Sequence, residues 1–220
     1  MKYIVENKNS NYIDEIKYII NTRKKEIYDF FNVPDQELNC NIYIYKNIES
    51  LINGLEKRGF GKFPSYICAC QRDEDNSINY FEPKDNPGPK EWSKEEYKMV
   101  IFHELIHAIE FNIYGNHPEW LSEGIAKYLD GTYSKGIKHL LENFVNKIKI
   151  PNQKEIEEEF GMHEDYNSYD YAYLMVSYLI EIYGKKSFIS GLKNINEFNK
   201  MYTDDLITKA INYFNSKYCL

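Results

Sequence analysis

The sequence has little cysteine, and its four cysteines show none of the usual functional spacings. They are Cys40, Cys68, Cys70 and Cys219. This arrangement fits neither a disulfide framework nor paired C-x-x-C motifs, which argues against a disulfide-stabilised mini-domain and against a cysteine-based zinc site. In Cys68-Ala-Cys70 both thiols would lie on one face of a strand, where we interpret them as small apolar residues. The simplest compartment is therefore a reducing cytoplasm.

Long apolar stretches and an excess of positive charge are also missing. Residues 1–9 contain no apolar segment of signal-peptide length, and no run approaches the roughly 18 apolar residues of a transmembrane helix. We therefore expect a cytoplasmic protein. The 27 Lys and Arg residues stand against 34 Asp and Glu, a formal net charge of -7. Because nucleic acids and anionic membranes bind basic surfaces, neither is expected as the main partner.

What is present is the composition of a globular protein. The chain has 220 residues, of which 43% are hydrophobic and 28% are charged. This length suits one compact domain, or two lobes that share a cleft, and it can bury a sizeable core. Composition therefore leaves the function open, and the motifs have to decide it.

The hydrophobic periodicity predicts a small sheet in the first third of the chain and helices afterwards, which is an α+β fold. The second and third strands could form a hairpin around a polar turn at 72–77, and residues 83–89 are expected to be a loop. The strands are predicted at 40–45, 66–70 and 78–81, and the helices at 11–31, 48–59, 93–114, 118–130, 135–148, 168–183 and 203–217.

The helix predicted at 93–114 carries the motif His103-Glu104-Leu-Ile-His107. Its start is marked by a capping box, Ser93 with Glu96, and Gly115 is suited to its end. At 1.5 Å rise per residue the two histidines lie on one face, about 6 Å apart along the axis.

Two imidazoles placed in this way can each reach a zinc ion at about 2.0–2.1 Å. Glu104 lies one step around the helix, close enough to act on a metal-bound water without being a ligand. The apolar neighbours Leu105 and Ile106 indicate a helix that faces the core. Burying two histidines and a glutamate there would be costly without compensation, and a metal ion supplies it.

A catalytic zinc needs a third protein ligand, and Glu123 is the candidate. Pro118 and Gly131 delimit a short second helix that contains Glu123. Gly124 inside this helix costs about 1 kcal/mol relative to alanine, which close approach of another helix would explain. A tight joint around Gly115 could fold the second helix back so that Glu123 faces the two histidines.

The motif is followed by Trp120-Leu-Ser-Glu123-Gly-Ile-Ala, with fifteen residues between His107 and Glu123, and this pattern resembles the gluzincin zinc peptidases. The resemblance is greatest to the peptidase-MA-like branch, with thermolysin-like enzymes and zinc aminopeptidases as more distant relatives. It is strong over about 95–131 and weaker to about 184. It implies that His103, His107 and Glu123 bind one zinc ion and that Glu104 is the catalytic base.

The resemblance also implies the architecture of the chain. It points to a single zincin-like catalytic domain over 1–220, with a small mixed sheet and the active-site helix in an upper lobe, about 1–114. A helical lower lobe, about 115–220, would contribute Glu123. The ligand spacing is shorter than in thermolysin-like enzymes, so the other site residues of that family cannot be transferred.

The group that stabilises the transition state is less well defined. The segment 169–179 resembles the tyrosine-bearing helix of the family, with Tyr169 in the matching place. His163 and His117 are competitors for the same role. Asp130 lies seven residues after Glu123, and it could orient a ligand imidazole. Glu110 is another candidate for that supporting role.

We therefore expect a zinc metallopeptidase that hydrolyses peptide bonds through a zinc-bound water activated by Glu104. An endopeptidase is favoured because the chain lacks the Gly-x-Met-Glu-Asn segment of the related aminopeptidases. Peptide or protein substrates could pair with a sheet edge, at 78–81 or 67–70. The alternative is a catalytically silent, zinc-stabilised peptide-binding or regulatory module, but such a module has no use for Glu104 as a base.

Overall fold

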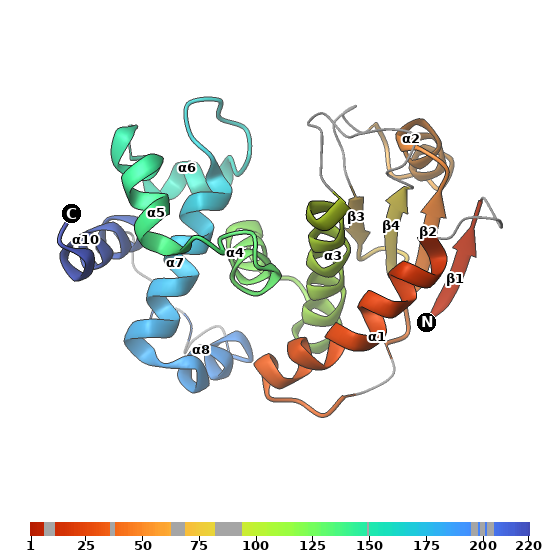
Figure 1. The fold of residues 1–220 in the computed structure, drawn as a ribbon, viewed down its shortest axis with the longest axis horizontal. Helices are drawn as coiled ribbons and strands as arrows, with labels where there is room; N and C mark the ends of the chain where they lie inside the picture. The colour runs from red at the N-terminus through yellow and green to blue at the C-terminus, as the bar shows by residue number, and fades with distance from the viewer. Residues whose placement is uncertain are drawn as a thin grey trace. The chain divides into compact units, whose positions relative to one another are not determined.

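The computed structural model of the chain describes residues 1–6, 12–35, 38–62, 69–81, 94–148, 150–194, 198, 201 and 205–220, with the backbone alone at 94–97. The chain divides into two compact units, Met1–Ile113 and Tyr114–Leu220. The first unit contains a four-stranded sheet and the second is helical, which confirms the predicted α+β class (Figure 1). That the two units form one catalytic domain stays a prediction.

The first unit is a small mixed sheet covered by helices. Its strand order is β1-β2-β4-β3, in which β1 and β2 are parallel, β2 and β4 are parallel, and β3 is antiparallel to β4. The elements are β1 (Lys2–Val5), α1 (Tyr12–Phe31), β2 (Asn41–Tyr45), α2 (Ile48–Lys57), β3 (Ala69–Arg72), β4 (Ser77–Phe81) and α3 (Lys94–Tyr114).

The two faces of the sheet pack against different helices, because successive side chains of a strand point to opposite sides. Tyr80 of β4 points to α3, where its hydroxyl donates a hydrogen bond to the carbonyl of Ile101. On the other face, a Cβ atom at Gly54 of α2 would collide with the ring of Tyr45. The sheet therefore lies between α2 on one side and α3 on the other.

Helix α1 packs beside α3 (Figure 1). The guanidinium carbon of Arg23 lies 3.4 Å from the centroid of the Phe102 ring, and Lys98 forms an ion pair with Glu15 at 3.5 Å. The buried residues of α1 recur at helical spacing and include Ile16, Ile20, Ile27 and Phe31, as the periodicity predicted.

The second unit is built around α7. Its apolar sequence agrees with this position, because Leu174, Met175 and Leu179 are all fully buried. Helices α4, α6, α8 and α10 contact α7 (Figure 1). The elements are α4 (Glu119–Asp130), α5 (Gly136–Asn143), the 3-10 helix η1 (Val145–Lys147), α6 (Gln153–Glu158), α7 (Ser168–Tyr183), α8 (Lys185–Leu192) and α10 (Leu206–Tyr218).

Several expectations from the sequence are confirmed and others are corrected. The hairpin is present, and α7 spans the predicted 168–183. The expectation that 78–81 is a sheet edge is wrong, because β4 lies between β2 and β3, whereas β3 is an edge. The helix predicted at 135–148 is interrupted after Asn143.

Among the elements that the structure describes, β1, α6 and α8 were not predicted. The predicted loop at 83–89, the capping box of Ser93 and Glu96, and Cys68 lie outside the residues and side chains that the structure describes. Within the described parts of the chain, none of the helices combines the length and the apolar character that crossing a membrane requires.

Candidate metal centre

Helix α3 brings the two histidines of the motif together. It ends at Tyr114, and the following Gly115 adopts a left-handed conformation (φ 77°) that few other residues tolerate. The Nε2 atoms of His103 and His107 are 3.0 Å apart, and their ring planes are inclined by 81°. The predicted arrangement on one helical face is therefore confirmed.

This separation suits a shared cation. Two nitrogens bound at about 2.1 Å to one tetrahedral zinc ion would be about 3.4 Å apart. Two neutral imidazoles can make the same contact only if one of them carries a proton on Nε2 and donates it to the other. A bound cation would satisfy the lone pairs of His103 and His107 at the same time, so this pair fits a metal site.

The surroundings of the pair are apolar. His103 and Glu104 are each 9% exposed, and Leu105 and Ile106 are completely buried. His107 is half-buried. Polar groups in such an environment need partners, because their transfer from water costs several kcal/mol when nothing compensates for it. The motif therefore lies on a largely buried part of α3 and not on a solvated helix surface.

Glu104 influences the neighbouring edge strand. The pKa of the Cys70 thiol on β3 is raised to about 12, first by burial and then by the negative charge of Glu104. Cys70 is therefore a neutral thiol at physiological pH, which agrees with its interpretation as a small apolar strand residue.

In the second unit, Glu123 lies on α4, whose ends are well defined. The carbonyl of Pro118 accepts hydrogen bonds from the backbone N–H groups of Leu121 and Ser122, and Gly131 ends the helix with a φ of 86°. Glu123 itself is half-buried. It occupies the second turn of α4, directly before the glycine that the sequence singled out.

That glycine explains how α4 is held against α7. A Cβ atom at Gly124 would lie 2.5 Å from the carbonyl oxygen of Ala172 and 2.6 Å from Cγ2 of Val176. The close approach of another helix, predicted from Gly124, is therefore confirmed. The backbone next to Glu123 cannot move toward α7, so the position of Glu123 within the second unit is closely determined.

His103, His107 and Glu123 offer one ligand atom each, and together they could hold a metal ion. Over the described ranges of the chain, no other group of three or more His, Cys, Asp and Glu side chains meets the same criterion.

Tyr169 lies at the start of α7, where Asn167 caps the helix by accepting a hydrogen bond from the Tyr169 N–H at 3.2 Å. Its ring makes an edge-to-face contact with Phe160 at 5.1 Å, and Lys127 Nζ lies 5.5 Å from its centroid. Tyr169 is thus held by its own unit, and a role in the transition state stays a prediction.

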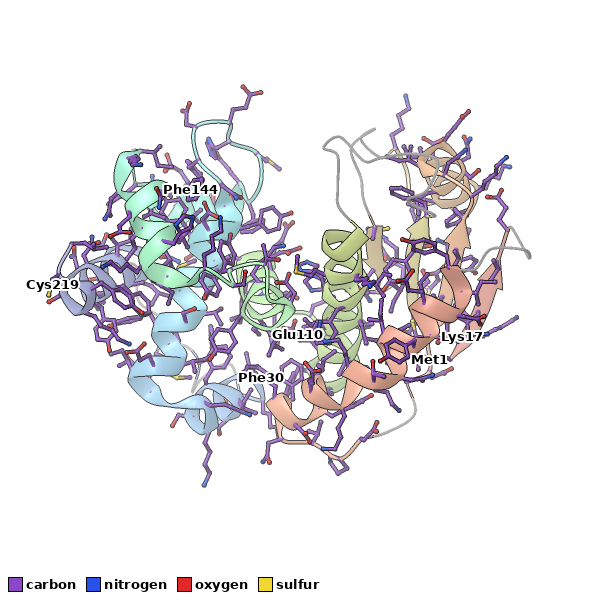
Figure 2. All side chains as sticks on the ribbon, viewed as in Figure 1. Met1, Lys17, Phe30, Glu110, Phe144 and Cys219 are labelled. Atoms are coloured by element: carbon purple, nitrogen blue, oxygen red, sulfur yellow. The ribbon has the colours of Figure 1, made fainter. Side chains whose placement is uncertain are left out.

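A supporting role for the two acidic candidates, Asp130 and Glu110, stays a prediction. Asp130 accepts a hydrogen bond from the N–H of Thr132 at 2.6 Å and pairs with Lys127 at 3.4 Å. Glu110 lies three residues after His107 and is almost completely buried on α3 (Figure 2).

The two competing histidines are similarly engaged. Nε2 of His163 lies 2.6 Å from Oε2 of Glu159, and Nε2 of His117 lies 3.4 Å from the carbonyl oxygen of Leu192. Both contacts are made within the second unit and give these histidines structural partners.

The sequence did not reveal a buried network at the start of α7. Asp170 accepts hydrogen bonds from the hydroxyl of Tyr133 and from Asn167 Nδ2, the latter at 3.1 Å. The ring of Tyr133 stacks on Tyr173 with centroids 4.2 Å apart. Burial raises the pKa of Asp170, while Tyr133 and the charge of Lys127 oppose that rise. Nothing in the local sequence joins Tyr133 to Asp170, 37 positions apart.

Comparison with known families identifies the class of protein. The family model of the Peptidase MA superfamily matches residues 87–216, which is more than half of the chain and includes both helices of the candidate site. The chain therefore belongs to the Peptidase MA superfamily. Membership indicates a metallopeptidase-like hydrolase with a metal cofactor and a peptide or protein substrate. No curated protein matches the sequence.

Proposed function

We propose that this chain is a zinc-dependent endopeptidase of the gluzincin type. In this proposal His103, His107 and Glu123 bind one zinc ion, and Glu104 is the catalytic base. The observation that carries it is the 3.0 Å separation of the two Nε2 atoms on a buried helix face directly beside Glu104. Family membership supports the same reading independently.

The choice of zinc rests on the donor set. Two imidazole nitrogens and one carboxylate oxygen are the ligands of many catalytic zinc sites, which keep a fourth position open. Magnesium and calcium prefer sites made of oxygen ligands alone. A site of His103, His107 and Glu123 would therefore favour zinc, whose chemical softness is intermediate, over the harder magnesium and calcium ions.

The connection between the two helices supports Glu123 as the third ligand. Only residues 115–118 separate α3 from α4. Four residues extend by at most about 14 Å, so the start of α4 is tethered close to the end of the helix that carries the histidines. The left-handed Gly115 allows the chain to reverse direction there.

The chemistry follows from these residues. When bound, zinc supplies Lewis acidity to the scissile carbonyl and lowers the pKa of a water molecule toward about 7. Glu104 takes a proton from the attacking water and then delivers it to the leaving amine as the C–N bond breaks. The products are a carboxylate and an amine. The hydroxyl of Tyr169 is the proposed donor to the developing oxyanion.

An endopeptidase is favoured for two reasons. The chain lacks the Gly-x-Met-Glu-Asn segment with which related aminopeptidases bind a free amine. In addition, β3 lies at an edge of the described sheet. The negative charge of Glu104 contributes, after burial, to the raised pKa of the Cys70 thiol on this strand. An extended peptide that pairs with such an edge would pass beside the proposed base.

The alternative is a zinc-stabilised binding or regulatory module without turnover. Two variants separate it from the enzyme, Glu104→Gln and the matched control Glu142→Gln, which makes the same chemical change at an exposed position on α5. Bound metal is measured by elemental analysis, and hydrolysis is measured with a mixed peptide library and with unfolded casein.

We expect one zinc ion in the wild type and in both variants, and at least a 1,000-fold loss of hydrolysis in Glu104→Gln alone. A wild type that binds zinc and cleaves nothing would favour the binding module. A wild type that binds no zinc would contradict both functions. Unchanged hydrolysis in Glu104→Gln would contradict the assignment of Glu104 as the catalytic base.

A further inference from the structure

A polar side chain occupies the middle of the sheet in the first unit. Asn79 of β4 is completely buried, and it lies opposite Cys70 of β3 in the antiparallel ladder. Its Nδ2 atom donates hydrogen bonds to the carbonyl oxygen of Cys70 and to Oγ of Ser77, each at 3.1 Å. Buried polar groups need such partners, because nothing else compensates for their removal from water. Asn79 therefore ties β4 to the strand at the edge of the described sheet (Figure 1).

Arg58, the residue that caps the end of α2, orients this amide. Its Nη2 atom donates a hydrogen bond to Oδ1 of Asn79, and its Nη1 atom pairs with Oδ2 of Asp75 at 2.8 Å. Because a guanidinium can only donate hydrogen bonds, the amide must turn its oxygen toward Arg58 and its nitrogen toward Cys70. The guanidinium carbon in turn lies 3.9 Å from the centroid of the Tyr43 ring, a cation–π contact that holds it in place.

The sequence of β3 specifies its pairing only weakly. A strand usually keeps its register because one face is apolar and buried, so that a slip of one residue would expose that face. The four residues of β3, Ala-Cys-Gln-Arg, are all half-buried, and none of them has a large apolar side chain. The bond from Asn79 supplies a different constraint. A slip would move the Cys70 carbonyl away and leave one buried N–H of the amide without its acceptor, which is costly.

The turn of the hairpin, residues 73–76, constrains mainly the near end of β3. Arg72 and Ser77 form the first pair after the turn, whereas Cys70 and Asn79 form the third. A bulge between the turn and the third pair would shift the far end of the strand, residues 69–70, by one residue. The Asn79 amide bonds the strand at that far end, so it disfavours such a shift where the turn no longer does.

The register decides which backbone groups β3 offers to a peptide. The groups that face β4 and those that face outward belong to alternate residues, so a shift of one residue exchanges the two sets. A shift of two residues moves the same groups by about 7 Å. Glu104 lies in the same unit, and its charge contributes to the raised pKa of the Cys70 thiol. A peptide on a shifted strand would therefore present a different bond to Glu104.

We propose that Asn79, oriented by Arg58, is a positioning residue that fixes the register of the far end of β3 for pairing with an extended peptide. The inference rests on the proposed function in one respect, namely that a peptide substrate pairs with this strand. Asn79 acts through the carbonyl of Cys70 and is not assigned a contact with the substrate.

The test is Asn79→Asp, which keeps the shape of the side chain and an acceptor for Arg58 but removes the donor to Cys70. Asn79→Leu, which is uncharged and of similar size, shows whether an effect comes from the added charge. The matched control is Asn76→Asp in the turn of the same hairpin. It makes the same chemical change, but the lost donor is bonded to the carbonyl of Asn39, outside the described strands.

Cross-strand NOEs between 69–72 and 77–80 measure the register directly and need neither metal nor substrate. The wild type and Asn76→Asp should show one set of NOEs, in which Cys70 is paired with Asn79. In both Asn79 variants the NOEs of residues 69–70 should weaken or move to other partners, while those between β2 and β4 remain and show that the unit is folded. Unchanged NOEs in both Asn79 variants would overturn the inference, as would an equal loss in Asn76→Asp.

Peptide hydrolysis gives the functional measurement. In both Asn79 variants the KM of a library peptide should rise about 5–30-fold, the effect of losing one buried hydrogen bond. The kcat should stay within about threefold of the wild type, because binding is weakened and the chemistry is not. A changed register with a wild-type KM would overturn the link to substrate binding. A wild type that cleaves no peptide would instead contradict the proposed function, and the NOEs would still decide the role of Asn79 in the register.

Discussion

Gly124 and Ala172 bring helices α4 and α7 so close together that a single methyl group does not fit between them. A Cβ atom at position 124 would lie 2.5 Å from the carbonyl oxygen of Ala172, a distance that real Cβ atoms do not adopt. The obstacle is backbone, which cannot rotate away as a side chain can. Because Glu123 is the preceding residue, this contact also holds the proposed metal ligand.

Gly124→Ala is therefore expected to destabilise the protein although alanine is the better helix former. Overpacking costs about 1–3 kcal/mol, while the gain in helix propensity is about 1 kcal/mol, so the free energy of unfolding should fall by up to about 2 kcal/mol. Zinc affinity should fall as α4 is displaced. Urea unfolding and chelator competition measure the two effects.

The control for this change is Gly191→Ala in α8. There the added Cβ atom would meet the terminal methyl of Met201, the end of a flexible side chain that can move aside. We expect little loss of stability and no change in zinc affinity. Equal behaviour of the two glycine variants would contradict the role of the Ala172 carbonyl.

Tyr133→Phe should destabilise the protein in a pH-dependent manner. The variant leaves the buried carboxylate of Asp170 without a hydrogen bond that lowers its pKa, so the pKa of Asp170 should rise further. A folded-state pKa above the unfolded value of about 3.9 means that the ionised form is disfavoured in the fold. The loss of stability should therefore be about 1.5–3 kcal/mol at pH 7.5 and become smaller as the pH falls toward 4.

Unfolding by urea at several pH values measures this effect. Tyr171→Phe is the control, because its buried hydroxyl has no hydrogen-bond partner among the residues that the structure describes. It should change stability little at any pH. A loss in Tyr133→Phe that is the same at pH 4 and pH 7.5 would show that the ionisation of Asp170 is not involved.

Tyr169→Phe tests the proposed oxyanion donor. The ring contacts with Phe160 and Lys127 do not need the hydroxyl, so they should be kept in the variant. Loss of one donor to an oxyanion typically lowers kcat about 100–1,000-fold. Steady-state kinetics should show this loss in kcat with little change in KM. Full activity of Tyr169→Phe would contradict Tyr169 as the oxyanion donor and leave His163 and His117 as the candidates.

Removal of the metal should lower the thermal stability. Zinc at 100 times its dissociation constant adds about 2.7 kcal/mol to the free energy of unfolding, equivalent to roughly 5–10 °C in Tm for a chain of this size. Differential scanning fluorimetry with zinc and with a chelator measures the difference. His103→Ala should abolish it, and His139→Ala on α5 should leave it intact. A zinc-dependent shift that survives in His103→Ala would place the metal elsewhere.

The cysteines should react with iodoacetamide at very different rates. Burial raises the pKa of Cys40 to about 12, whereas Cys219 is exposed. At pH 8 a buried thiol with a pKa of about 12 carries very little of the reactive thiolate, and the reagent reaches Cys219 at the surface, so Cys219 should be labelled before Cys40. Peptide mass spectrometry identifies the modified cysteine. In denaturant, Cys40 and Cys219 should react with iodoacetamide at similar rates.

The raised pKa of Cys40 also predicts the sign of a pH effect on stability. Between about pH 9 and 12 the unfolded chain loses the thiol proton that the folded protein keeps, so stability should fall as the pH rises through this range. Cys40→Ala should have a smaller slope than the wild type. Native Cys40 that is labelled as fast as Cys219 would contradict its burial.

Local periodicity was enough to predict α1 and α7, because a helix satisfies its own backbone hydrogen bonds and its apolar residues recur within a few positions. The same reasoning placed His103, Glu104 and His107 on one turn of α3, since i and i+4 residues of any helix are neighbours. It also predicted that Gly124 would face another helix. In these cases the information lies within a few residues.

Only the tertiary structure revealed which distant residues meet. The strand β1 became evident through its pairing with β2, and β4 proved to be internal because β2 pairs with it across a long stretch of chain. The bonds from Tyr80 to Ile101 and from Tyr133 to Asp170 join residues 21 and 37 positions apart. Such contacts depend on how whole elements pack, and packing is decided by the combined fit of many side chains. The amino-acid sequence by itself therefore determined the chemistry on α3, and the tertiary structure decided which residues hold that helix and α4 in place.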